Sequence, residues 1–285
     1  MIILSLFDGI SCGQLALQRA GIKYEKYYAS EIDESAIKVT QKHFPKTIQL
    51  GDIRNFGEWD IETPDLIMGG SPCQDLSCAG NKAGLYGEQS SLFFEFVKVL
   101  HKYKPKYFLL ENNASMAAQY KEEITEILGV EPILINSNLV SAQNRKRLYW
   151  TNIPGVAQPT DKGIFLRDIV VPRAQKQEFE CWDIIRIKKE GTQARKNAFG
   201  KMKTLDQKAN CLGTTQHITN ANATNIKYSE TEVYIPTPLE CERLQTLPDN
   251  YTDILCKTRR YKAIGNGWTV DVIAHIFNGL KKEAL

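Results

Sequence analysis

The chain has 285 residues, of which 42% are hydrophobic and 24% are charged. These proportions are typical of a globular protein and exclude a disordered or collagen-like chain, and the length suits one large domain or a large and a small one. No apolar run approaches the roughly 18 residues that a membrane-spanning helix needs. The apolar stretch Met1–Leu6 has no basic flank and leads directly into Asp8. We therefore expect a first strand there and not a signal peptide.

Seven cysteines and four histidines are scattered along the chain. Because no two cysteines form a C-x-x-C pair, we expect no structural zinc and no other metal. The odd number of cysteines fits a reduced cytoplasmic setting, where a cysteine with a particular role has it because of its reactivity. We expect a monomer that does not bind a membrane.

The positive charge is concentrated in one region. The net charge of the chain is only +3, but residues 151–228 hold 13 Lys and Arg against 7 Asp and Glu. Arg145, Lys146 and Arg147 lead into this region. Such a concentration suits a polyanion, because each neutralised phosphate releases counterions. A solvated basic face is the simpler alternative, and charge alone favours it.

The first 150 residues alternate strand and helix signals. Apolar runs that end in Gly, Asp or Glu predict strands, and apolar residues spaced three and four apart predict helices. The alternation predicts an α/β fold, a doubly wound and mostly parallel sheet with helices on both faces and ligands at the carboxyl ends of the strands. The predicted strands are Ile2–Phe7, Lys26–Ser30, Thr47–Leu50, Leu66–Met68, Tyr107–Leu110, Ile133–Ile135 and Leu148–Trp150, and the predicted helices are Leu15–Ala20, Asp33–Phe44, Leu92–Leu100 and Ile124–Leu128.

The alternation stops after residue 150. Residues 154–237 are polar, basic and irregular, and apolar spacing resumes after them. Val270–Leu280 has the spacing of a terminal helix. We predict a sheet domain of residues 1–153 plus 262–285 and a second, smaller domain with a hinge, residues 154–261.

Three consecutive strand ends carry residues suited to a nucleoside. The first strand leads into Phe7–Gly13, where glycine lets the backbone approach a ligand and the next helix begins. Glu31 follows the second strand as an acceptor for ribose hydroxyls, and Asp52 follows the third as an acceptor for an amine. Each residue alone is a weak signal, since a glycine turn is more often only a turn. Together, without the spacing G-x-G-x-x-G, they favour S-adenosylmethionine over a dinucleotide.

A cysteine and an acid follow the next two predicted strands. Cys73 comes after a Gly-Gly pair and opens a loop that contains three more glycines, and Glu111 ends the following strand. A lone cysteine is usually a small buried hydrophobe. This one lies at the carboxyl end of a strand, where a thiol and a carboxyl can converge. The pair indicates nucleophilic attack with acid assistance.

Six short motifs complete the pattern, namely Phe7–Gly13, Pro72–Gln74, Glu111–Asn112, Gln143–Arg147, Glu242–Gln245 with Pro248, and Gly265–Gly267. Their order and spacing resemble those of the DNA cytosine-5 methyltransferase family, and the resemblance covers the whole chain except its basic middle. Several motif variants are similar to the animal de novo branch, whereas the short length resembles bacterial or phage-borne members.

The resemblance implies a catalytic site for methyl transfer to cytosine. Cys73 would add to carbon 6 of the ring, which makes carbon 5 nucleophilic towards the methyl group. Glu111 would donate a hydrogen bond to ring nitrogen 3, so it should be protonated when it acts. Arg145 would hold the carbonyl oxygen of the ring, with Gln143 and Arg147 shaping its surroundings.

The same resemblance implies how the cofactor and the DNA are bound. The loop from Gln74 to about Ser90 would close over a base that has been flipped out of the duplex. Residues 154–237 would occupy the place of the target recognition domain. The implied contacts to S-adenosylmethionine are Phe7, Asp8, Gly9, Gly13, Glu31, Ile32, Asp52, Ile53, Leu92, Asn266 and Trp268, and those to DNA are Gln74, Ser77, Lys146 and Thr204.

Simpler roles stay open for some of these side chains. Ile32, Ile53 and Leu92 can equally be core residues, and Lys146 and Arg147 can be plain phosphate contacts.

Three positions depart from the family pattern. Ser11 stands in place of a glycine, and we expect it to narrow the backbone clearance at the cofactor. Asn113 stands where valine is common and adds a polar group behind Glu111. Gly267 replaces a common serine. None of these changes removes a catalytic group.

The sequence therefore predicts an S-adenosylmethionine-dependent DNA (cytosine-5) methyltransferase that acts on duplex DNA and releases S-adenosylhomocysteine. A companion restriction endonuclease is a candidate partner. Two rivals remain, a tRNA cytosine-5 methyltransferase of the same family and a catalytically silent DNA-binding protein. The basic region argues mildly against the first, and Cys73, Glu111 and Arg145 argue against the second.

Overall fold

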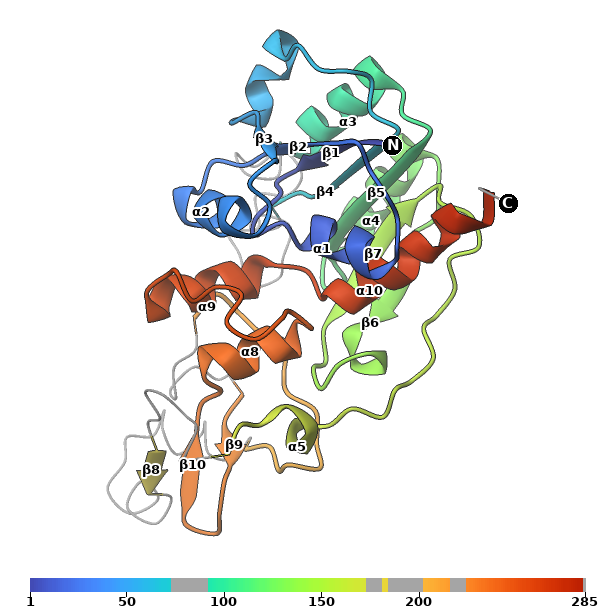
Figure 1. The fold of residues 1–285 in the computed structure, drawn as a ribbon. Helices are drawn as coiled ribbons and strands as arrows, with labels where there is room; N and C mark the ends of the chain where they lie inside the picture. The colour runs from blue at the N-terminus through green and yellow to red at the C-terminus, as the bar shows by residue number, and fades with distance from the viewer. Residues whose placement is uncertain (73–91, 173–180, 184–201, 216–223, 284–285) are drawn as a thin grey trace. The chain divides into compact units, whose positions relative to one another are not determined.

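The computed structural model describes residues 1–72, 92–172, 181–183, 202–215 and 224–283 (Figure 1). The chain divides into two compact units. The first unit comprises Met1–Ile135, Lys146–Gln158 and Ile273–Leu285, and the second comprises Asn136–Arg145 and Pro159–Val272. The predicted division into a catalytic and a recognition domain concerns function and stays a prediction.

The first unit is built on a sheet of seven strands: β1 (Ile2–Leu6), β2 (Lys26–Ser30), β3 (Ile48–Gln49), β4 (Leu66–Gly70), β5 (Tyr107–Asn113), β6 (Ile133–Asn136) and β7 (Lys146–Thr151). The order across the sheet is β3-β2-β1-β4-β5-β7-β6 (Figure 1). The pairs from β3 to β5 are all parallel, whereas β7 runs antiparallel to β5. The mostly parallel sheet predicted from the alternation is confirmed.

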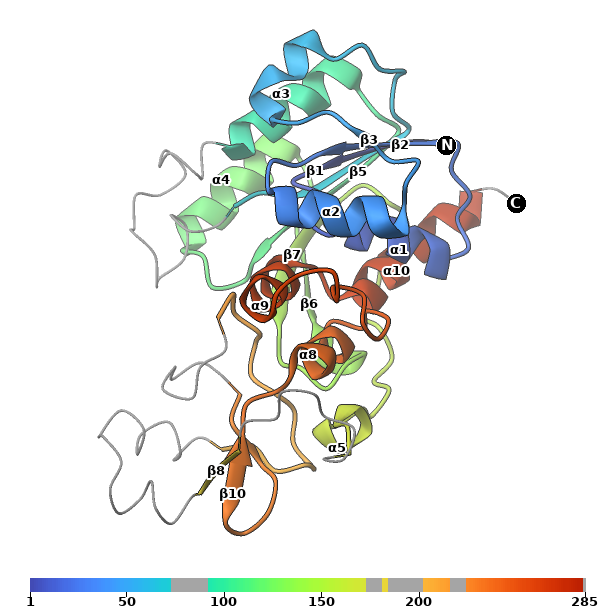
Figure 2. The ribbon, with the colours of Figure 1, turned by 60° about the vertical axis from the view of Figure 1, so that its left-hand side comes forward.

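Helices cover both faces of this sheet (Figure 2). Helices α1 (Cys12–Arg19) and α2 (Glu34–His43) lie on one face, and α3 (Leu92–Tyr103) and α4 (Ala118–Leu128) lie on the other. On the second face Leu4 and Leu6 of β1 belong to one buried cluster with Phe93 and Phe96 of α3. The side chains of β1 alternate between the faces, so this strand is buried on both sides, as central strands of parallel sheets are.

Local signals explain most of the element ends. Asp33 caps α2 by accepting the N–H of Ser35, and Gly129 ends α4 in the left-handed conformation. β5 is longer than predicted, because its ladder with β7 continues to Asn113, so Glu111 lies inside the strand. The terminal helix α10 (Val270–Phe277) ends earlier than predicted and continues as the 3-10 turn η5 (Asn278–Glu283).

The second unit combines short helices with a small antiparallel sheet of order β8-β10-β9. Its strands have only two or three residues, too short to show a period in the sequence, which explains why residues 154–237 read as irregular. The elements among the described residues of this unit are the 3-10 turn η3 (Ser137–Leu139), α5 (Leu166–Ile169), β8 (Cys181–Asp183), β9 (Ile226–Lys227), β10 (Glu232–Tyr234), α8 (Pro238–Leu244) and α9 (Lys257–Asn266).

A buried acid holds α8, α9 and the loop between them together. The carboxylate of Glu242, on α8, accepts the backbone N–H groups of Asn250 and Thr252 and pairs with the guanidinium of Arg260 at 2.9 Å. Its side chain is fully buried, so losing a partner would leave a charge without compensation. Helix α9 was not predicted because its sequence is largely polar.

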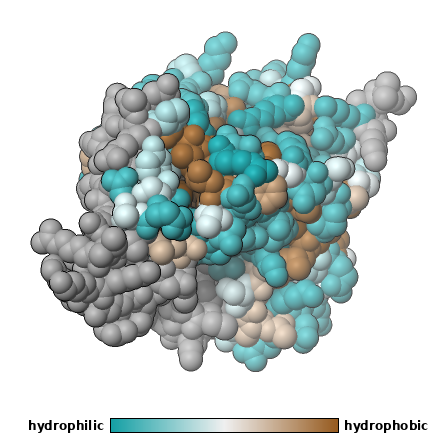
Figure 3. Space-filling view, turned by 90° about the horizontal axis from the view of Figure 1, so that it is seen from below, coloured by the Kyte–Doolittle hydropathy of each residue, from teal (hydrophilic) through white to brown (hydrophobic). Residues whose placement is uncertain are grey.

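None of the helices among the described residues is both long enough and apolar enough to span a bilayer. On the face seen in Figure 3, the described residues are mostly hydrophilic, with hydrophobic side chains gathered in small patches. That face therefore has the character of an ordinary water-exposed surface.

Gly69 allows β1 and β4 to pack closely. A Cβ at Gly69 would lie 2.8 Å from the carbonyl oxygen of Leu6 and 3.3 Å from a ring carbon of Phe96. We predict that Gly69→Ala lowers the free energy of unfolding by about 1 to 3 kcal/mol through overpacking. Gly57→Ala is the matched control, because its Cβ would meet nothing within 4 Å. Urea unfolding of both variants tests this, and equal stabilities would contradict it.

Candidate active site and cofactor-binding site

The loop between β1 and α1 has an unusual backbone. Phe7, Gly9 and Ser11 all have φ between 57° and 59°, in the left-handed region. For a residue with a Cβ this conformation costs roughly 1 to 2 kcal/mol, so other interactions must hold Phe7 and Ser11 in place. The loop lies at the carboxyl end of the central strand, where ligands of such sheets bind.

A buried polar cluster holds this loop from beneath. The hydroxyls of Ser11 and Tyr27 each donate to the carboxylate of Asp8 at 2.7 Å. Gln14 donates to the Ser11 hydroxyl and to Thr47, at 2.9 and 2.7 Å. The side chain of Ser11 is therefore directed into the protein, and the prediction that it narrows the clearance at the cofactor is wrong. The left-handed backbone at Ser11 turns its side chain towards Asp8.

Asp8 is a carboxyl in an unfavourable environment. It is 9% exposed, and this burial raises its pKa to about 6, although the hydrogen bonds from neighbouring hydroxyls favour the charged form. The nearby charge of Glu31 raises the pKa further. Asp8 was predicted to lie around the methionine part of the cofactor, and the structure directs its carboxylate beneath the loop.

Glu31 holds the same loop from the other side. One of its oxygens accepts the N–H of Gly9 at 2.8 Å, and the other accepts the N–H groups of Ile32 and Asp33 at 2.8 Å each. The carboxylate joins the end of β2 to the loop after β1 and stays partly exposed. These two strand ends were the ones expected to bind the nucleoside.

Asp52 lies after β3, as predicted, and has a cationic partner. Its carboxylate caps the 3-10 turn η1 (Ile53–Glu58) and pairs with the guanidinium of Arg54. The hydrogen bonds from Arg54 hold the pKa of Asp52 below its usual value. Arg54 was not predicted as part of this site, although a basic residue two positions after an acidic N-cap is a visible signal in the sequence.

The apolar residues predicted for the cofactor site differ in how far they are exposed. Ile53 is 3% exposed and belongs to the core cluster that includes residues of α3 and α4. Its surroundings therefore match the simpler alternative, a core residue. Ile32 is 68% exposed and can present an apolar surface to a ligand. Leu92 is partly buried at the start of α3. Gly13 packs against Met68, where a Cβ would lie 2.5 Å from the terminal methyl carbon.

Glu111 forms a mostly buried ion pair across the antiparallel strands. The guanidinium Nε of Arg147 on β7 lies 2.9 Å from a carboxylate oxygen of Glu111 on β5, and the two side chains are 13% and 11% exposed. Arg147 also donates to the carbonyl of Lys146 at 2.9 Å and, at 3.5 Å, to the side-chain oxygen of Asn113. Asn113 is the strand partner of Arg147 in the ladder. The polar side chain that was expected behind Glu111, that of Asn113, therefore contacts the guanidinium of Arg147.

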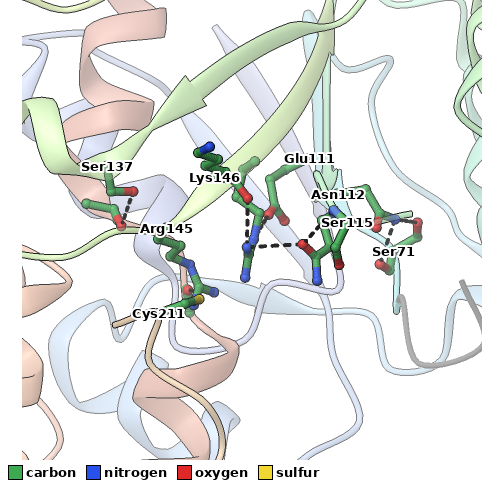
Figure 4. Close-up of polar contacts among 12 residues, drawn as sticks. Ser71, Glu111, Asn112, Ser115, Ser137, Arg145, Lys146 and Cys211 are labelled. Carbon is green, nitrogen blue, oxygen red and sulfur yellow. Dashed lines mark hydrogen bonds and ion pairs between the residues drawn. The ribbon is translucent and has the colours of Figure 1, made fainter. Parts of the chain in front are cut away.

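Asn112 points away from Glu111 towards Ser71, as Figure 4 shows. Its amide nitrogen donates to the hydroxyl and the carbonyl oxygen of Ser71, at 3.2 and 3.3 Å. Ser71 is two residues before Cys73, so this contact connects the strand of the predicted acid to the segment that leads to the predicted nucleophile. Cys73, Gln74, Ser77 and the rest of the loop to Ser90 lie outside the described residues.

Arg145 and Gln143 form hydrogen bonds within the second unit. The guanidinium of Arg145 is nearly fully buried and donates to the carbonyls of Leu212, Gly265 and Gly267 at 3.0 to 3.1 Å. Gln143, fully buried, donates to the carbonyl of Leu244 and accepts the N–H of Leu212. These contacts join three segments of the second unit.

Four further predicted residues also lie on elements of the structure. Asn266 is exposed at the end of α9, and Trp268 is partly buried just after it, both in the second unit. Lys146 is exposed at the start of β7. Thr204 is exposed too, and its backbone N–H donates to the side-chain oxygen of Gln207. The exposed side chains of Asn266, Lys146 and Thr204 are accessible to a ligand. The partly buried side chain of Trp268 is less accessible.

Comparison with known proteins identifies the family. The model of the C-5 cytosine-specific DNA methylases matches this chain in two overlapping stretches, residues 1–233 and 152–282. The chain belongs to this family. The resemblance inferred from the six motifs is thereby confirmed.

Individual relatives agree with this assignment. The orphan methyltransferase M.SPRI of Bacillus phage SPR is 31% identical over 163 residues, which cover 53% of this chain and 37% of the phage protein. The type II methyltransferase M.HpaII of Haemophilus parainfluenzae is 29% identical over 95% of this chain and 86% of its own length. This chain thus spans about a third of the phage relative but most of the bacterial one.

Among solved structures, the Dnmt2 methyltransferase of S. pombe has a similar fold, with a TM-score of 0.73 at 17% identity and full coverage of both chains. This similarity supports the predicted methyltransferase fold of this member of the DNA methylase family.

The raised pKa of Asp8 predicts a pH-dependent stability. Because the pKa of Asp8 in the folded protein, about 6, lies above the usual aspartate value of 3.8, the folded protein binds a proton at pH 5 that the unfolded chain does not bind. Stability is therefore lost as the pH rises through 6. We predict that the free energy of unfolding of Asp8→Asn, relative to wild type, rises by roughly 2 kcal/mol between pH 4.5 and 7.5.

Urea unfolding at several pH values measures this difference. The exposed Asp60 supplies the control Asp60→Asn, whose stability should stay parallel to that of the wild type. Parallel curves for Asp8→Asn would show that burial does not shift Asp8.

Proposed function

We propose that the protein transfers a methyl group from S-adenosylmethionine to carbon 5 of a flipped-out cytosine in duplex DNA. The observation that carries this proposal is the buried ion pair of Glu111 and Arg147, in a chain of the C-5 cytosine-specific DNA methylase family. An acid and a guanidinium side by side can bind two neighbouring polar atoms of cytosine, ring nitrogen 3 and the carbonyl oxygen.

The ends of β1 and β2 suit S-adenosylmethionine. Asp8 and Glu31 bring negative charge to a loop that would face a ligand with a sulfonium and an ammonium group. The exposed side chain of Ile32 offers an apolar surface for adenine, next to Glu31 at the position for the ribose. The cofactor supplies the methyl group and leaves as S-adenosylhomocysteine, and the proposed chemistry uses no metal.

The chain's own residues would activate the cytosine. The thiolate of Cys73 forms a bond to carbon 6, and the displaced ring electrons move towards nitrogen 3, where Glu111 donates a hydrogen bond. Carbon 5 then takes up the methyl group. Loss of the carbon 5 proton to a solvent base, followed by departure of the sulfur from carbon 6, restores the ring and the free cysteine.

We assign the contact to the carbonyl oxygen of cytosine to Arg147. The donors of Arg145, the residue expected in this role, are used by backbone carbonyls of the second unit. Arg147 instead lies beside Glu111. Both side chains of this pair would then turn to the base, Arg147 to its carbonyl oxygen and Glu111 to ring nitrogen 3.

The wider setting is also a proposal. The second unit would read the DNA sequence, and the basic residues within 151–228 suit phosphate contacts. The protein would act as a monomer in the cytoplasm of a bacterial or phage-infected cell. The name of the type II relative M.HpaII supports a companion restriction endonuclease as a candidate partner.

Transfer of labelled methyl groups tests the activity. Wild type and Cys73→Ala are incubated with labelled S-adenosylmethionine and either duplex DNA or tRNA. We expect label in DNA as 5-methylcytosine, and none with the variant. Label only in tRNA would reassign the substrate, and DNA binding without any transfer would indicate a silent binding protein.

Two arginine variants test the assignment of roles. We predict that Arg147→Gln lowers kcat by about 10²- to 10³-fold, because a hydrogen-bond donor to the reacting base is lost. Arg145→Gln should lower the free energy of unfolding by about 2 to 4 kcal/mol, because buried carbonyls lose their donors. Single-turnover methyl transfer and urea unfolding of both variants separate the effects. A stable, inactive Arg145→Gln would return the catalytic role to Arg145.

A further inference from the structure

Four acidic residues lie at the carboxyl ends of β1, β2, β3 and β5, and they differ in whether a cation compensates their charge. Asp52 pairs with Arg54, and Glu111 pairs with Arg147. Among the residues that the structure describes, Asp8 and Glu31 form no ion pair with a Lys, Arg or His. The negative charge that remains is therefore concentrated at the loop after β1.

The partners of these two carboxylates are neutral. The carboxylate of Asp8 accepts the hydroxyls of Ser11 and Tyr27, and Ser5 is a further neutral side-chain partner. The carboxylate of Glu31 accepts three backbone N–H groups. Burial disfavours the charged form of Asp8 and raises its pKa to about 6, yet at neutral pH the carboxyl is mostly ionised. A buried charge of this kind is normally paired with an opposite charge. Here the described part of the chain does not supply one, so a bound ligand can.

We propose that Asp8 is a specificity-determining residue that acts by charge through the loop and makes the protein prefer a sulfonium ligand to its thioether product. The inference rests on the proposed function, because it takes S-adenosylmethionine as the cofactor. The two ligands differ by one methyl group and one positive charge. Hydrogen bonds to the ribose or adenine are common to both, so only a charged group near the sulfur distinguishes them strongly.

The expected effect is measurable. At an effective dielectric constant of about 20, two unit charges roughly 10 Å apart interact strongly enough to change a dissociation constant about tenfold. The charge of Asp8 lies beneath the loop in a water-poor region, where salt screens it little. Preference for the sulfonium over the thioether would help the product leave after each methyl transfer.

Calorimetric titration tests the proposal. S-adenosylmethionine and S-adenosylhomocysteine are titrated into wild type, Asp8→Asn and Tyr27→Phe. We expect Asp8→Asn to reduce the ratio of the thioether Kd to the sulfonium Kd about tenfold. Tyr27→Phe is the matched control, because it removes one hydrogen bond that favours the charged form of Asp8 but keeps the carboxyl group, and all titrations are made at pH 8.5 so that this carboxyl stays ionised. This control should change both dissociation constants by a similar factor and leave the ratio unchanged.

Further measurements separate charge from structure. Asp8→Ser, which also removes the charge, repeats the test if Asp8→Asn unfolds, and thermal unfolding checks both variants. An analogue in which a charged amine replaces the sulfonium should behave like S-adenosylmethionine with every variant. An unchanged ratio in folded, charge-free variants that still transfer methyl groups would overturn this inference alone. Failure of the wild type to bind either ligand would overturn it together with the cofactor assignment.

Discussion

The antiparallel pairing of β7 with β5 is the constraint on which the candidate active site depends. Parallel strands bring their carboxyl ends to one edge of the sheet, so β1, β2, β4 and β5 all deliver their last residues there. Strand β7 runs the other way, and its first residues therefore lie beside the last residues of β5. This is why Arg147, 36 positions after Glu111 in the sequence, meets its carboxylate at 2.9 Å.

Charge is distributed along this edge in a way that matches the proposed chemistry. At the β5 end, a carboxyl and a guanidinium neutralise each other and can separate when a polar base edge enters. At the β1 and β2 ends, two carboxylates hold one loop between them without a cation among the described residues. Burying Asp8 costs stability, and such costs are expected at functional sites, where local rules of good packing and charge pairing are broken.

The sequence predicted the elements of the first unit well because their signals are local. Lys26–Ser30 was predicted with the observed bounds, and the helix predicted over Asp33–Phe44 is α2, with Asp33 as its N-cap. Helix α9 was missed because a partly buried arginine, Arg260, and not an apolar stripe anchors it to the acid on α8. The directions in which side chains point could not be predicted from the sequence either. Ser11 looked like an obstruction at the cofactor, and the left-handed backbone directs it to Asp8 instead.

The sequence by itself determined the family, the mostly parallel fold and the set of residues from which the site is built, because motif order and hydrophobic period are properties of the chain alone. Only the tertiary structure decided which groups these side chains contact. Arg145 and Arg147 are two positions apart and chemically identical, yet one is surrounded by carbonyls of the second unit and the other by the acid of β5. Partners far apart in sequence determine that difference, since the role of a charged side chain depends on which groups fold against it.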